Sequence, residues 1–369
     1  MKIAYLLGVL RRGGTETLRL NVFRNAQKAD YQFVGIHRKD GEYKEAFYSS
    51  GQKMYKLAPR FIFDVAYFLK LRKIFKTEKI DIAHAQLSID ALYAKFASIF
   101  PKTKVILTTH GYDNFNKKNY LLSFILKYTD KNFFVSDFQR EYYTKKYRLN
   151  PRKLQTVYNG ISFDKIDGCK ETTHLFSDNY KGLLIGSVGN FAYTRTQIVI
   201  CRALRLLAEK NVDFRFVFAG LRLDNQAHLY DECVDFCKEN NLLNTKVFFL
   251  GGRDDVPNIL KQLDVFVYSS AHDTFGIAVI EAIACGLPVF VNDWGVMKEV
   301  SDNGKFAILY RTKDENDLLE KFLLFLKNES FYKEEAKKNA VEIRKKFPVE
   351  QHIRELEKEY KKLLTVNCN

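Results

Sequence analysis

Short apolar segments alternate with longer amphipathic segments along almost the whole chain, and this alternation constrains the fold more than any other feature. In the first half, apolar runs and segments of helical periodicity follow each other at 3–7, 15–29, 32–36, 63–76, 80–84, 88–100 and 104–108. Strands of about five residues separated by helices favour a parallel sheet with helices on both faces. The sequence therefore predicts a doubly wound α/β domain.

The same pattern restarts after residue 182. Apolar runs lie at 183–188, 214–219, 246–250, 265–269 and 288–291. A chain of 369 residues is also long enough for two domains. Residues 163–182 are polar and weakly periodic, which is typical of a linker. We predict an N-terminal domain at 1–165, a C-terminal domain at 166–347, and a C-terminal helix at 348–369. Two Rossmann-like domains of this kind would face each other across a cleft.

Composition is that of a globular protein, with 46% hydrophobic and 28% charged residues. No segment reaches the ~18–20 apolar residues that span a bilayer, and the first residues lead straight into a strand rather than a signal-peptide core. We therefore expect a cytoplasmic protein. Its cysteines form no paired CxxC pattern and are interpreted as reduced thiols, with zinc as the minor alternative. They are Cys169, Cys201, Cys233, Cys237, Cys285 and Cys368.

Positive charge is concentrated in the first part of the chain. Residues 1–160 hold 30 Lys and Arg against 13 Asp and Glu, a net charge of +17 (30 − 13). The remainder holds 29 Lys and Arg against 31 Asp and Glu, so the whole positive excess of the chain, whose net charge is +15, lies in the first part. Such asymmetry suggests an anionic partner, which could be a membrane leaflet, an acidic acceptor or a nucleic acid. Residues 61–79 and 119–131 mix apolar with basic side chains, as membrane-surface helices and sheet-covering helices both do.

Ligands of open α/β sheets bind beyond the carboxyl ends of the strands, so the loops there are the places to look for chemistry. The loop after the first strand holds Arg11, Arg12, Gly13 and Gly14 and opens a helix. Such a loop lets backbone N–H groups approach an anion closely. It matches neither common phosphate-binding glycine pattern, so a plain tight turn remains the alternative.

The strongest signal is an acidic pair in 269–289. An apolar strand ends at Ser269, a helix begins near Phe275 and closes at Gly286, and Asp273 and Glu281 lie eight positions apart (281 − 273). Eight helical residues rise about 12 Å. That span suits an activated sugar at one end, a diphosphate on the helix N-terminus and a ribose at the other end.

This segment resembles the acid-x7-Glu signature of retaining glycosyltransferases of family 4, whose fold is GT-B. The resemblance implies that the domain at 1–165 binds the acceptor and that the domain at 166–347 binds the nucleotide-sugar donor. It also implies that the helix at 348–369 packs back on the first domain. The resemblance implies that Asp273 contacts hydroxyls of the donor sugar and that Glu281 holds the ribose diol. It further implies that the amides of Phe275 and Gly276 approach the sugar and phosphate. The family usually has Glu at the first position, and Asp273 is shorter by about 1–1.5 Å. This difference leaves the donor sugar open.

Residues 181–195 resemble the family segment that carries Arg directly after a glycine and Lys five residues later. Here those positions hold Asn190 and Arg195. One cation is therefore missing, and Arg195 is expected to stabilise the leaving diphosphate. Residues 218–220 and 247–251 resemble the strand ends that line the nucleotide base.

In the first half, residues 108–111 end a strand, and the resemblance places His110 close to the donor sugar. His84, after the strand at 80–83, is interpreted as a residue that only lines the cleft. His272 is assigned no role. No acidic pair is placed to hold a divalent metal, so no metal or other cofactor is expected; the helix dipole and Arg195 would replace one. No carboxylate is marked as a covalent nucleophile, and the resemblance implies same-face attack by the acceptor.

The sequence is thus interpreted as a retaining glycosyltransferase that moves a hexose or N-acetylhexosamine from a nucleotide-sugar, in particular a UDP-sugar, to a glycan acceptor. The acceptor would be lipid-linked or at the cell surface, as in lipopolysaccharide, O-antigen or capsule synthesis, with peripheral contact to the inner face of the cell membrane. The predicted catalytic residues are His110, Asp273 and Arg195. The predicted donor-binding residues are Gly14, Asn190, Arg195, Gly220, Asp273, Thr274, Phe275, Gly276, Ile277 and Glu281. A nucleotide-sugar epimerase of the same fold and a basic nucleic-acid-binding protein are the alternatives.

Overall fold

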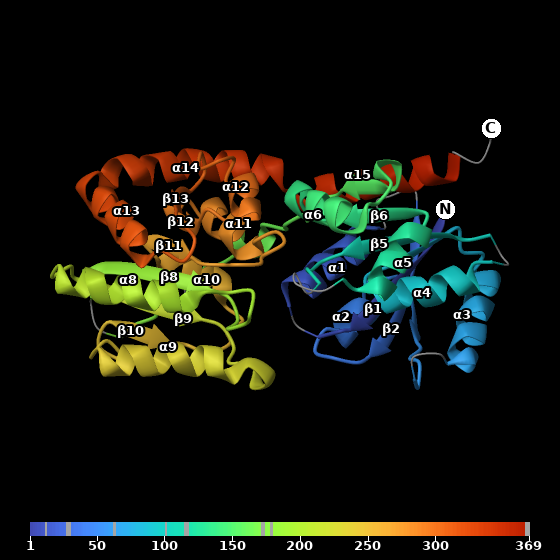
Figure 1. Ribbon diagram of the computed structural model, residues 1–369, viewed down its shortest axis with the longest axis horizontal. Coiled ribbons are helices and arrows are strands. Elements are labelled where there is room, and N and C mark those ends of the chain that lie inside the picture. The colour runs from blue at the N-terminus through green and yellow to red at the C-terminus, as the bar shows by residue number, and fades with distance from the viewer. Residues whose placement is uncertain are drawn as a thin grey trace. The chain divides into compact units, whose positions relative to one another are not determined.

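A computed structural model describes residues 1–11, 13–26, 31–61, 64–99, 102–113, 118–170, 174–177 and 180–365. Arg12, Cys368 and part of the predicted linker lie outside the described residues. The chain divides into two compact units (Figure 1). Unit 1 comprises Met1–Ser162 and Phe347–Asn369, and unit 2 comprises Phe163–Lys346. Each unit is described by itself.

Unit 1 contains a seven-stranded sheet in the order β3-β2-β1-β4-β5-β6-β7, and all of its pairings are parallel. Its strands are β1 (Lys2–Val9), β2 (Gln32–Lys39), β3 (Lys53–Lys56), β4 (Ile82–Ala85), β5 (Lys104–Thr109), β6 (Lys131–Phe134) and β7 (Leu154–Thr156). Its helices are α1 (Gly14–Asn25), α2 (Lys44–Tyr48), α3 (Val65–Glu78), α4 (Ser88–Ala97), α5 (Tyr120–Tyr128), α6 (Asp137–Tyr147) and α15 (Val349–Thr365).

Helices cover both faces of this sheet. Strand β1 sends Ala4 and Leu6 into a core shared with α3, α4, α5 and α6. Its alternate residues, Ile3, Tyr5 and Leu7, enter a second core with α1, α2 and α15. Because successive side chains of a strand point to opposite faces, this division is what a doubly wound domain requires. The C-terminal helix α15 is therefore part of unit 1.

Local sequence accounts for several helix boundaries in unit 1. The side chain of Asp64 accepts a hydrogen bond from the N–H of Tyr67 and caps α3, and Asn119 does the same for Leu122 in α5. At its carboxyl end α3 closes on Lys79, which adopts the left-handed conformation. The caps fix where each amphipathic helix starts along the sheet.

Unit 2 contains a six-stranded parallel sheet in the order β10-β9-β8-β11-β12-β13. Its strands are β8 (Leu183–Val188), β9 (Phe214–Ala219), β10 (Val247–Phe249), β11 (Val265–Tyr268), β12 (Val289–Asn292) and β13 (Ile308–Tyr310). Its helices are α7 (Asp164–Asp167), α8 (Gln197–Glu209), α9 (Ala227–Glu239), α10 (Val256–Gln262), α11 (Ile277–Ala284), α12 (Gly295–Val300), α13 (Glu315–Lys327) and α14 (Glu329–Lys346).

The strand order of unit 2 determines where its loops meet. The chain crosses from β10 back to β11, beside β8, so β8 and β11 are central neighbours. Their carboxyl ends lead into residues 189–196 and 269–276, the two segments that carry most of the predicted donor-binding residues. The predicted domain boundary at residue 165 falls inside α7, three residues after the division between the units.

Candidate active site

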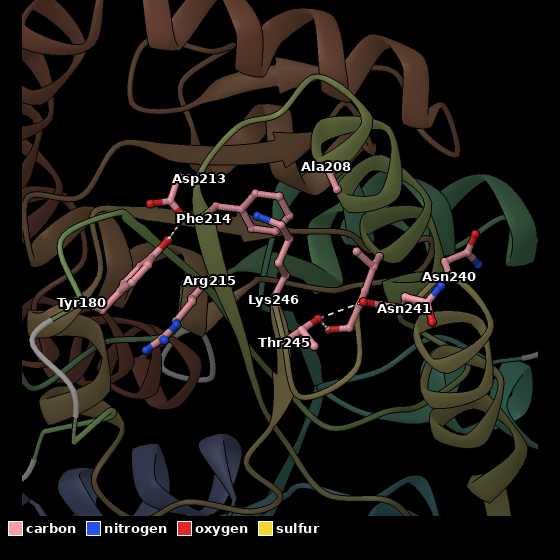
Figure 2. Close-up of a pocket in the computed structure, with 10 residues that line it drawn as sticks. Tyr180, Ala208, Asp213, Phe214, Arg215, Asn240, Asn241, Thr245 and Lys246 are labelled. Carbon is pink, nitrogen blue, oxygen red and sulfur yellow. Dashed lines mark hydrogen bonds between the residues drawn. The ribbon is translucent and has the colours of Figure 1, made fainter.

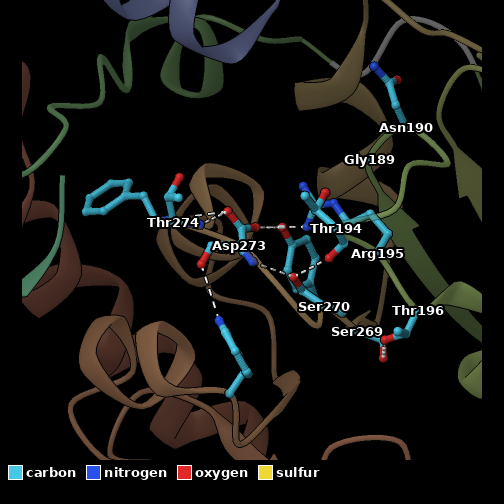
Figure 3. Close-up of polar contacts among 12 residues, drawn as sticks. Gly189, Asn190, Thr194, Arg195, Thr196, Ser269, Ser270, Asp273 and Thr274 are labelled. Carbon is cyan, nitrogen blue, oxygen red and sulfur yellow. Dashed lines mark hydrogen bonds and ion pairs between the residues drawn. The ribbon is translucent and has the colours of Figure 1, made fainter. Parts of the chain in front are cut away.

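The loops that follow β8 and β11 are joined by backbone hydrogen bonds. The N–H of Thr196 donates to the carbonyl oxygen of Ser269 at 3.2 Å, and the N–H of Ala271 donates to that of Thr194 at 3.1 Å. The Ser270 hydroxyl also donates to the Thr194 carbonyl oxygen at 2.7 Å. Figure 3 shows the result, in which Arg195 and Asp273 point toward one another.

Asp273 is held by four hydrogen-bond donors. Its Oδ2 atom accepts from Arg195 Nη1 at 3.0 Å and from the hydroxyl of Tyr268. Its Oδ1 atom accepts from the backbone N–H groups of Thr274 at 2.7 Å and Phe275 at 3.2 Å. An ionised carboxylate offers about four lone-pair sites, so all of them are engaged.

The backbone around Asp273 is fixed as firmly as its side chain. Its N–H donates to the Ser270 hydroxyl oxygen at 3.0 Å, and Trp294 Nε1 donates to its carbonyl oxygen at 3.3 Å. The side chain of Asn292, at the end of β12, exchanges two hydrogen bonds with the backbone of Ser270. The loop after β11 is thus tied to β12 as well as to the loop after β8.

Arg195 lies in a half-buried position beside Gly189. Its guanidinium carbon is 4.2 Å from the ring centroid of Tyr268. Burial lowers the pKa of Arg195, and the charge of Asp273 opposes that shift. Within the described residues, Nη1 has Asp273 as its acceptor, and no acceptor is found for Nη2 and Nε. A Cβ at Gly189 would lie 3.4–3.5 Å from these guanidinium atoms, an ordinary van der Waals contact, and the φ of 151° at Gly189 is what favours glycine there.

Gly276 is the N-cap residue of helix α11, and its φ of 80° is in the left-handed region that favours glycine. A Cβ there would also lie 2.8 Å from the terminal methyl of Met297. The first N–H groups of α11, beginning with Ile277, follow the turn that holds Asp273. Such groups have no partner within a helix and suit an anionic ligand.

Glu281 lies one turn into α11 and is only partly exposed. Among the described residues its carboxylate has no hydrogen-bond donor. Burial raises its pKa to about 7, and the charge of Lys165 opposes that rise. A carboxyl group without a partner inside the protein is suited to receive the hydroxyls of a ligand.

Asn190 and Gly220 connect the loops that follow β8 and β9. The side-chain oxygen of Asn190 accepts from the N–H of Leu221 at 2.9 Å. A Cβ at Gly220 would lie 2.0 Å from the carbonyl oxygen of Gly189, so only glycine permits this approach. Asn190 therefore braces two loops here and adds no charge beside Arg195.

His110 and Gly14 belong to unit 1. His110 follows β5, and its Nε2 atom lies 2.6 Å from the amide oxygen of Gln86. Burial, with a further contribution from the charge of Arg19, lowers the pKa of His110 well below its ordinary value. Gly14 is the first residue of α1.

The other two histidines that the sequence brought forward have clear surroundings. His84 is buried, and its ring nitrogens lie 2.6 Å from the hydroxyl oxygens of Tyr360 and Thr108. It is therefore a structural residue of the sheet and α15. The His272 ring packs edge-on against Trp294, 5.3 Å between centroids.

Sequence reasoning missed three residues that organise these loops: Tyr268, Trp294 and Gln86. Tyr268 ends β11 and contacts both Asp273 and Arg195. Its position directly before the acidic loop was the available signal. Gln86 follows β4, the neighbour of β5, so the strand order alone could have placed it next to His110.

A pocket of about 440 Å³ lies elsewhere in unit 2 (Figure 2). It is at the amino ends of β8, β9 and β10, where Tyr180 donates a hydrogen bond to Asp213 at 2.9 Å. None of the predicted site residues lines it. In the described part of the chain, no group of three ligand side chains could hold a metal ion, and Cys169, Cys201, Cys233, Cys237 and Cys285 are free thiols. The expectation that no metal is required stays a prediction.

Known proteins resemble the chain in both units. Residues 12–165 match the family model described as Glycosyltransferase Family 4, and residues 176–345 match the model described as Glycosyl transferases group 1. A glycosyltransferase of Methanocaldococcus jannaschii is 26% identical over 302 residues, 79% of this chain and 78% of that protein. The UDP-Gal:α-D-GlcNAc-diphosphoundecaprenol α-1,3-galactosyltransferase of Escherichia coli is 26% identical over 246 residues, 62% of each chain.

The fold has solved counterparts. Anabaena HepE in complex with UDP superposes with a TM-score of 0.83 at 15% identity, covering 98% of this chain and 100% of that chain. At this identity the likeness concerns the fold, which is GT-B. Together with the two family models, it gives the class of the enzyme. The chain belongs to the family 4 type of glycosyltransferases.

Proposed function

We propose that this glycosyltransferase moves a hexose or an N-acetylhexosamine from a UDP-sugar to a lipid-linked or cell-surface glycan, with retention of configuration. The observation that carries the proposal is the arrangement at the carboxyl edge of the unit 2 sheet. Arg195 pairs with Asp273 on the loop that leads into α11, and its Nη2 and Nε atoms have no acceptor among the described residues. Helix α11 carries Glu281, whose carboxyl has no hydrogen-bond donor in the described part of the chain. A nucleoside diphosphate has complementary groups in its phosphates and ribose diol.

The leaving diphosphate would gain charge as its bond to the sugar breaks. Nη2 and Nε of Arg195 and the first amides of α11 are donors that stabilise this charge without a metal. Asp273 is the carboxylate nearest to these donors in the loop, and each of its oxygens already receives two hydrogen bonds. Such hydrogen bonds weaken a carboxylate as a nucleophile, which supports same-face attack by the acceptor over a covalent glycosyl-enzyme.

The relatives support the substrate classes. The E. coli relative uses UDP-galactose and a diphosphoundecaprenol-linked sugar, as its name states, and HepE binds UDP. We infer that the present chain uses substrates of the same classes. This chain covers 62% of the length of the E. coli relative, so we do not transfer the sugar or the linkage of that protein to this chain.

Transfer assays test this proposal. Purified protein is incubated with UDP-, GDP- or ADP-hexoses and a sugar linked to a diphospho-lipid, and the anomeric configuration of the product is read by NMR. We expect transfer from a UDP-α-sugar to give an α-linked product, and Glu281→Ala to lose donor binding while keeping its thermal melting temperature. An inverted product would contradict retention. Conversion of the donor to its epimer without acceptor would favour an epimerase.

We further infer that unit 1 contacts anionic membrane through a surface formed by α3, α4 and α5. Helix α4 packs between the other two (Figure 1). The exposed apolar residues of this α3–α5 surface are Phe61, Val65, Leu69, Phe96, Ile99, Tyr120, Leu121, Phe124 and Tyr128. Its exposed cations are Lys70, Lys73, Lys76, Lys118 and Lys127.

The acids of the same elements do not offset these cations. Asp64, Glu78 and Asp90 are buried and pair with Arg60, Lys53 and Arg38, and Asp130 pairs with Lys95. Asp81 accepts a hydrogen bond from the N–H of Lys2 at 2.8 Å. The α3–α5 surface therefore presents apolar and basic groups together, which is the chemistry of a helix lying in an anionic lipid interface. None of the described helices has the length and apolar composition to cross a membrane.

Co-sedimentation with vesicles tests this contact. We expect binding to vesicles that contain phosphatidylglycerol, weaker binding in high salt, and little binding to pure phosphatidylcholine. The double variant Leu121→Ser, Phe124→Ser should lose binding, while Leu324→Ser, Phe331→Ser, which changes exposed residues of unit 2, should keep it. Equal binding by both variants would contradict the assignment of the surface.

A further inference from the structure

Asp273 occupies the position whose side chain, by resemblance, contacts the donor sugar, yet its surroundings indicate another role. We propose that Asp273 and Tyr268 are positioning residues that hold the guanidinium of Arg195 in place for the diphosphate, and that Asp273 does not read the sugar. This inference rests on the proposed nucleotide-sugar site and assigns a role within it.

The hydrogen-bonding capacity of the Asp273 carboxylate is fully used within the protein. Each carboxylate oxygen of Asp273 receives two donors: Nη1 of Arg195 and the Tyr268 hydroxyl on Oδ2, and the N–H groups of Thr274 and Phe275 on Oδ1. A sugar hydroxyl could donate to Asp273 only by displacing one of them. Rotation of the Asp273 side chain toward a sugar would take Oδ1 away from the N–H groups of Thr274 and Phe275. Displacement of the Tyr268 hydroxyl would cost it this hydrogen bond in a buried position.

Arg195 is held in place by two groups, Asp273 and Tyr268. Asp273 binds one end of the guanidinium, and the Tyr268 ring lies 4.2 Å from its central carbon. Tyr268 is itself 1% exposed, and its carbonyl oxygen accepts a hydrogen bond from the Tyr310 hydroxyl at 2.8 Å. A long, flexible arginine is thereby fixed by two groups on rigid backbone.

Two nitrogen atoms of the Arg195 guanidinium are left available to a ligand. With Nη1 engaged by Asp273, Nη2 and Nε remain without acceptors in the described chain and lie against Gly189. A fixed pair of neighbouring N–H donors matches two oxygens of a phosphate. Asp273 thus orients the cation whose charge the donor's diphosphate meets.

The side-chain lengths of Asp273 and Arg195 depend on each other in this arrangement. Asp273 is one methylene shorter than Glu, and Arg195 is longer than Lys, so the pair closes across the gap between the two loops. We therefore expect that either residue changed in length alone will misplace the cation, and that opposite changes will compensate each other in part.

UDP, which lacks a sugar, separates positioning from sugar recognition. UDP affinity is measured by calorimetry for wild type, Asp273→Asn and Tyr268→Phe. Asn at 273 would set an amide N–H₂ against Arg195, and we expect UDP binding to weaken about tenfold or more, with a smaller loss for Tyr268→Phe, which keeps the ring. The matched control is Asp264→Asn, at the opposite end of β11, where Asp264 pairs with Lys333 at 3.0 Å; its UDP affinity should not change.

A double-mutant cycle shows whether the effect passes through Arg195. In an Arg195→Met background, Asp273→Asn and Tyr268→Phe should cause no further loss of UDP affinity. The double variant Asp273→Glu, Arg195→Lys should bind UDP more tightly than either single variant. Melting temperatures identify a variant that fails to fold, in which case the Tyr268→Phe cycle alone decides.

The outcomes are distinct. UDP affinity unchanged in Asp273→Asn, with loss confined to UDP-sugars, would overturn the positioning role and return Asp273 to the sugar. Additive losses in the cycle would also overturn it. Absence of UDP, GDP and ADP binding by the wild-type protein would overturn the proposed function itself.

Discussion

The Nε2 atom of His110 and the amide oxygen of Gln86 are 2.6 Å apart. An amide oxygen can only accept, so with this side-chain assignment His110 donates through Nε2–H. Because burial keeps the pKa of His110 well below its ordinary value, the ring is neutral near neutral pH. His110 is therefore arranged as a hydrogen-bonding group and not as a cation.

We expect that the ring protons of His110 do not titrate in NMR between pH 6 and 8, and that Gln86→Glu raises the pKa of His110 by placing a carboxylate against it. The signal is assigned by its loss in His110→Gln. Titration of the wild-type residue near pH 6.5 would show that the neutral arrangement is wrong.

Glu281 should make the stability of the free protein depend on pH. Its folded-state pKa of about 7 is above the ordinary 4.5, so between these values the folded state retains a proton that the unfolded state has released. Stability is therefore lost as pH rises from about 4.5 through 7. Glu281→Gln removes this penalty, and we expect it to raise the free energy of unfolding by about 1–3 kcal/mol at pH 8, with little change at pH 5.

Urea denaturation at the two pH values measures this difference. The control is Glu334→Gln, which changes an exposed glutamate of α14. The same Glu281→Gln variant should bind donor poorly, since the carboxylate that would receive the ribose diol is gone. A stabilised variant with normal donor binding would separate Glu281 from the site.

A side chain at position 276 should destabilise the protein, chiefly through the left-handed backbone conformation there. The φ of Gly276 is 80°, and a Cβ would lie 2.8 Å from the Met297 methyl. We expect Gly276→Ala to cost about 1–3 kcal/mol of stability and to displace the start of α11. Gly111→Ala is the matched control, because no atom lies within 4 Å of a Cβ there. Equal melting temperatures for the two variants would contradict the strain.

Trp294 is the single tryptophan of the chain, and its indole N–H donates to the carbonyl oxygen of Asp273. Its emission should therefore change when nucleotide binds at this loop. We expect a saturable fluorescence change with UDP in the wild-type protein, and its loss in Arg195→Met. A change that persists in that variant at the same UDP concentration would place nucleotide away from Arg195.

Much of the fold follows from periodicity, because apolar strands of a doubly wound sheet leave an unmistakable pattern. The runs at 3–7, 104–108 and 265–269 correspond to β1, β5 and β11. Strands β3, β6, β7 and β13 were missed, and each has only three or four residues, too few for a clear apolar run. Strands β3, β7 and β13 also lie at sheet edges, where partial exposure removes the apolar signal.

The site was predictable in its parts and not in its contacts. The acid pair and the glycine turn are local signals, and they located Asp273, Gly276 and Glu281 on one turn and helix. Arg195 and Asp273 are 78 residues apart in sequence, and they pair because β8 and β11 are neighbours in the sheet. Periodicity cannot supply that order of strands. The bracing role of Asn190 has the same origin, since its partner Leu221 follows a different strand.

The inclusion of α15 in unit 1 has a consequence for biosynthesis. Val349, Ile353, Leu356 and Tyr360 are buried in the core formed with α1 and β1, although the ribosome makes them after the whole of unit 2. During translation, the apolar face of unit 1 that α15 covers stays exposed until residues 347–365 have been made. Unit 2 can fold earlier, because its sequence is contiguous. A fragment that stops at residue 162 should accordingly aggregate or recruit chaperones, and supplying residues 347–365 as a separate peptide should restore its solubility.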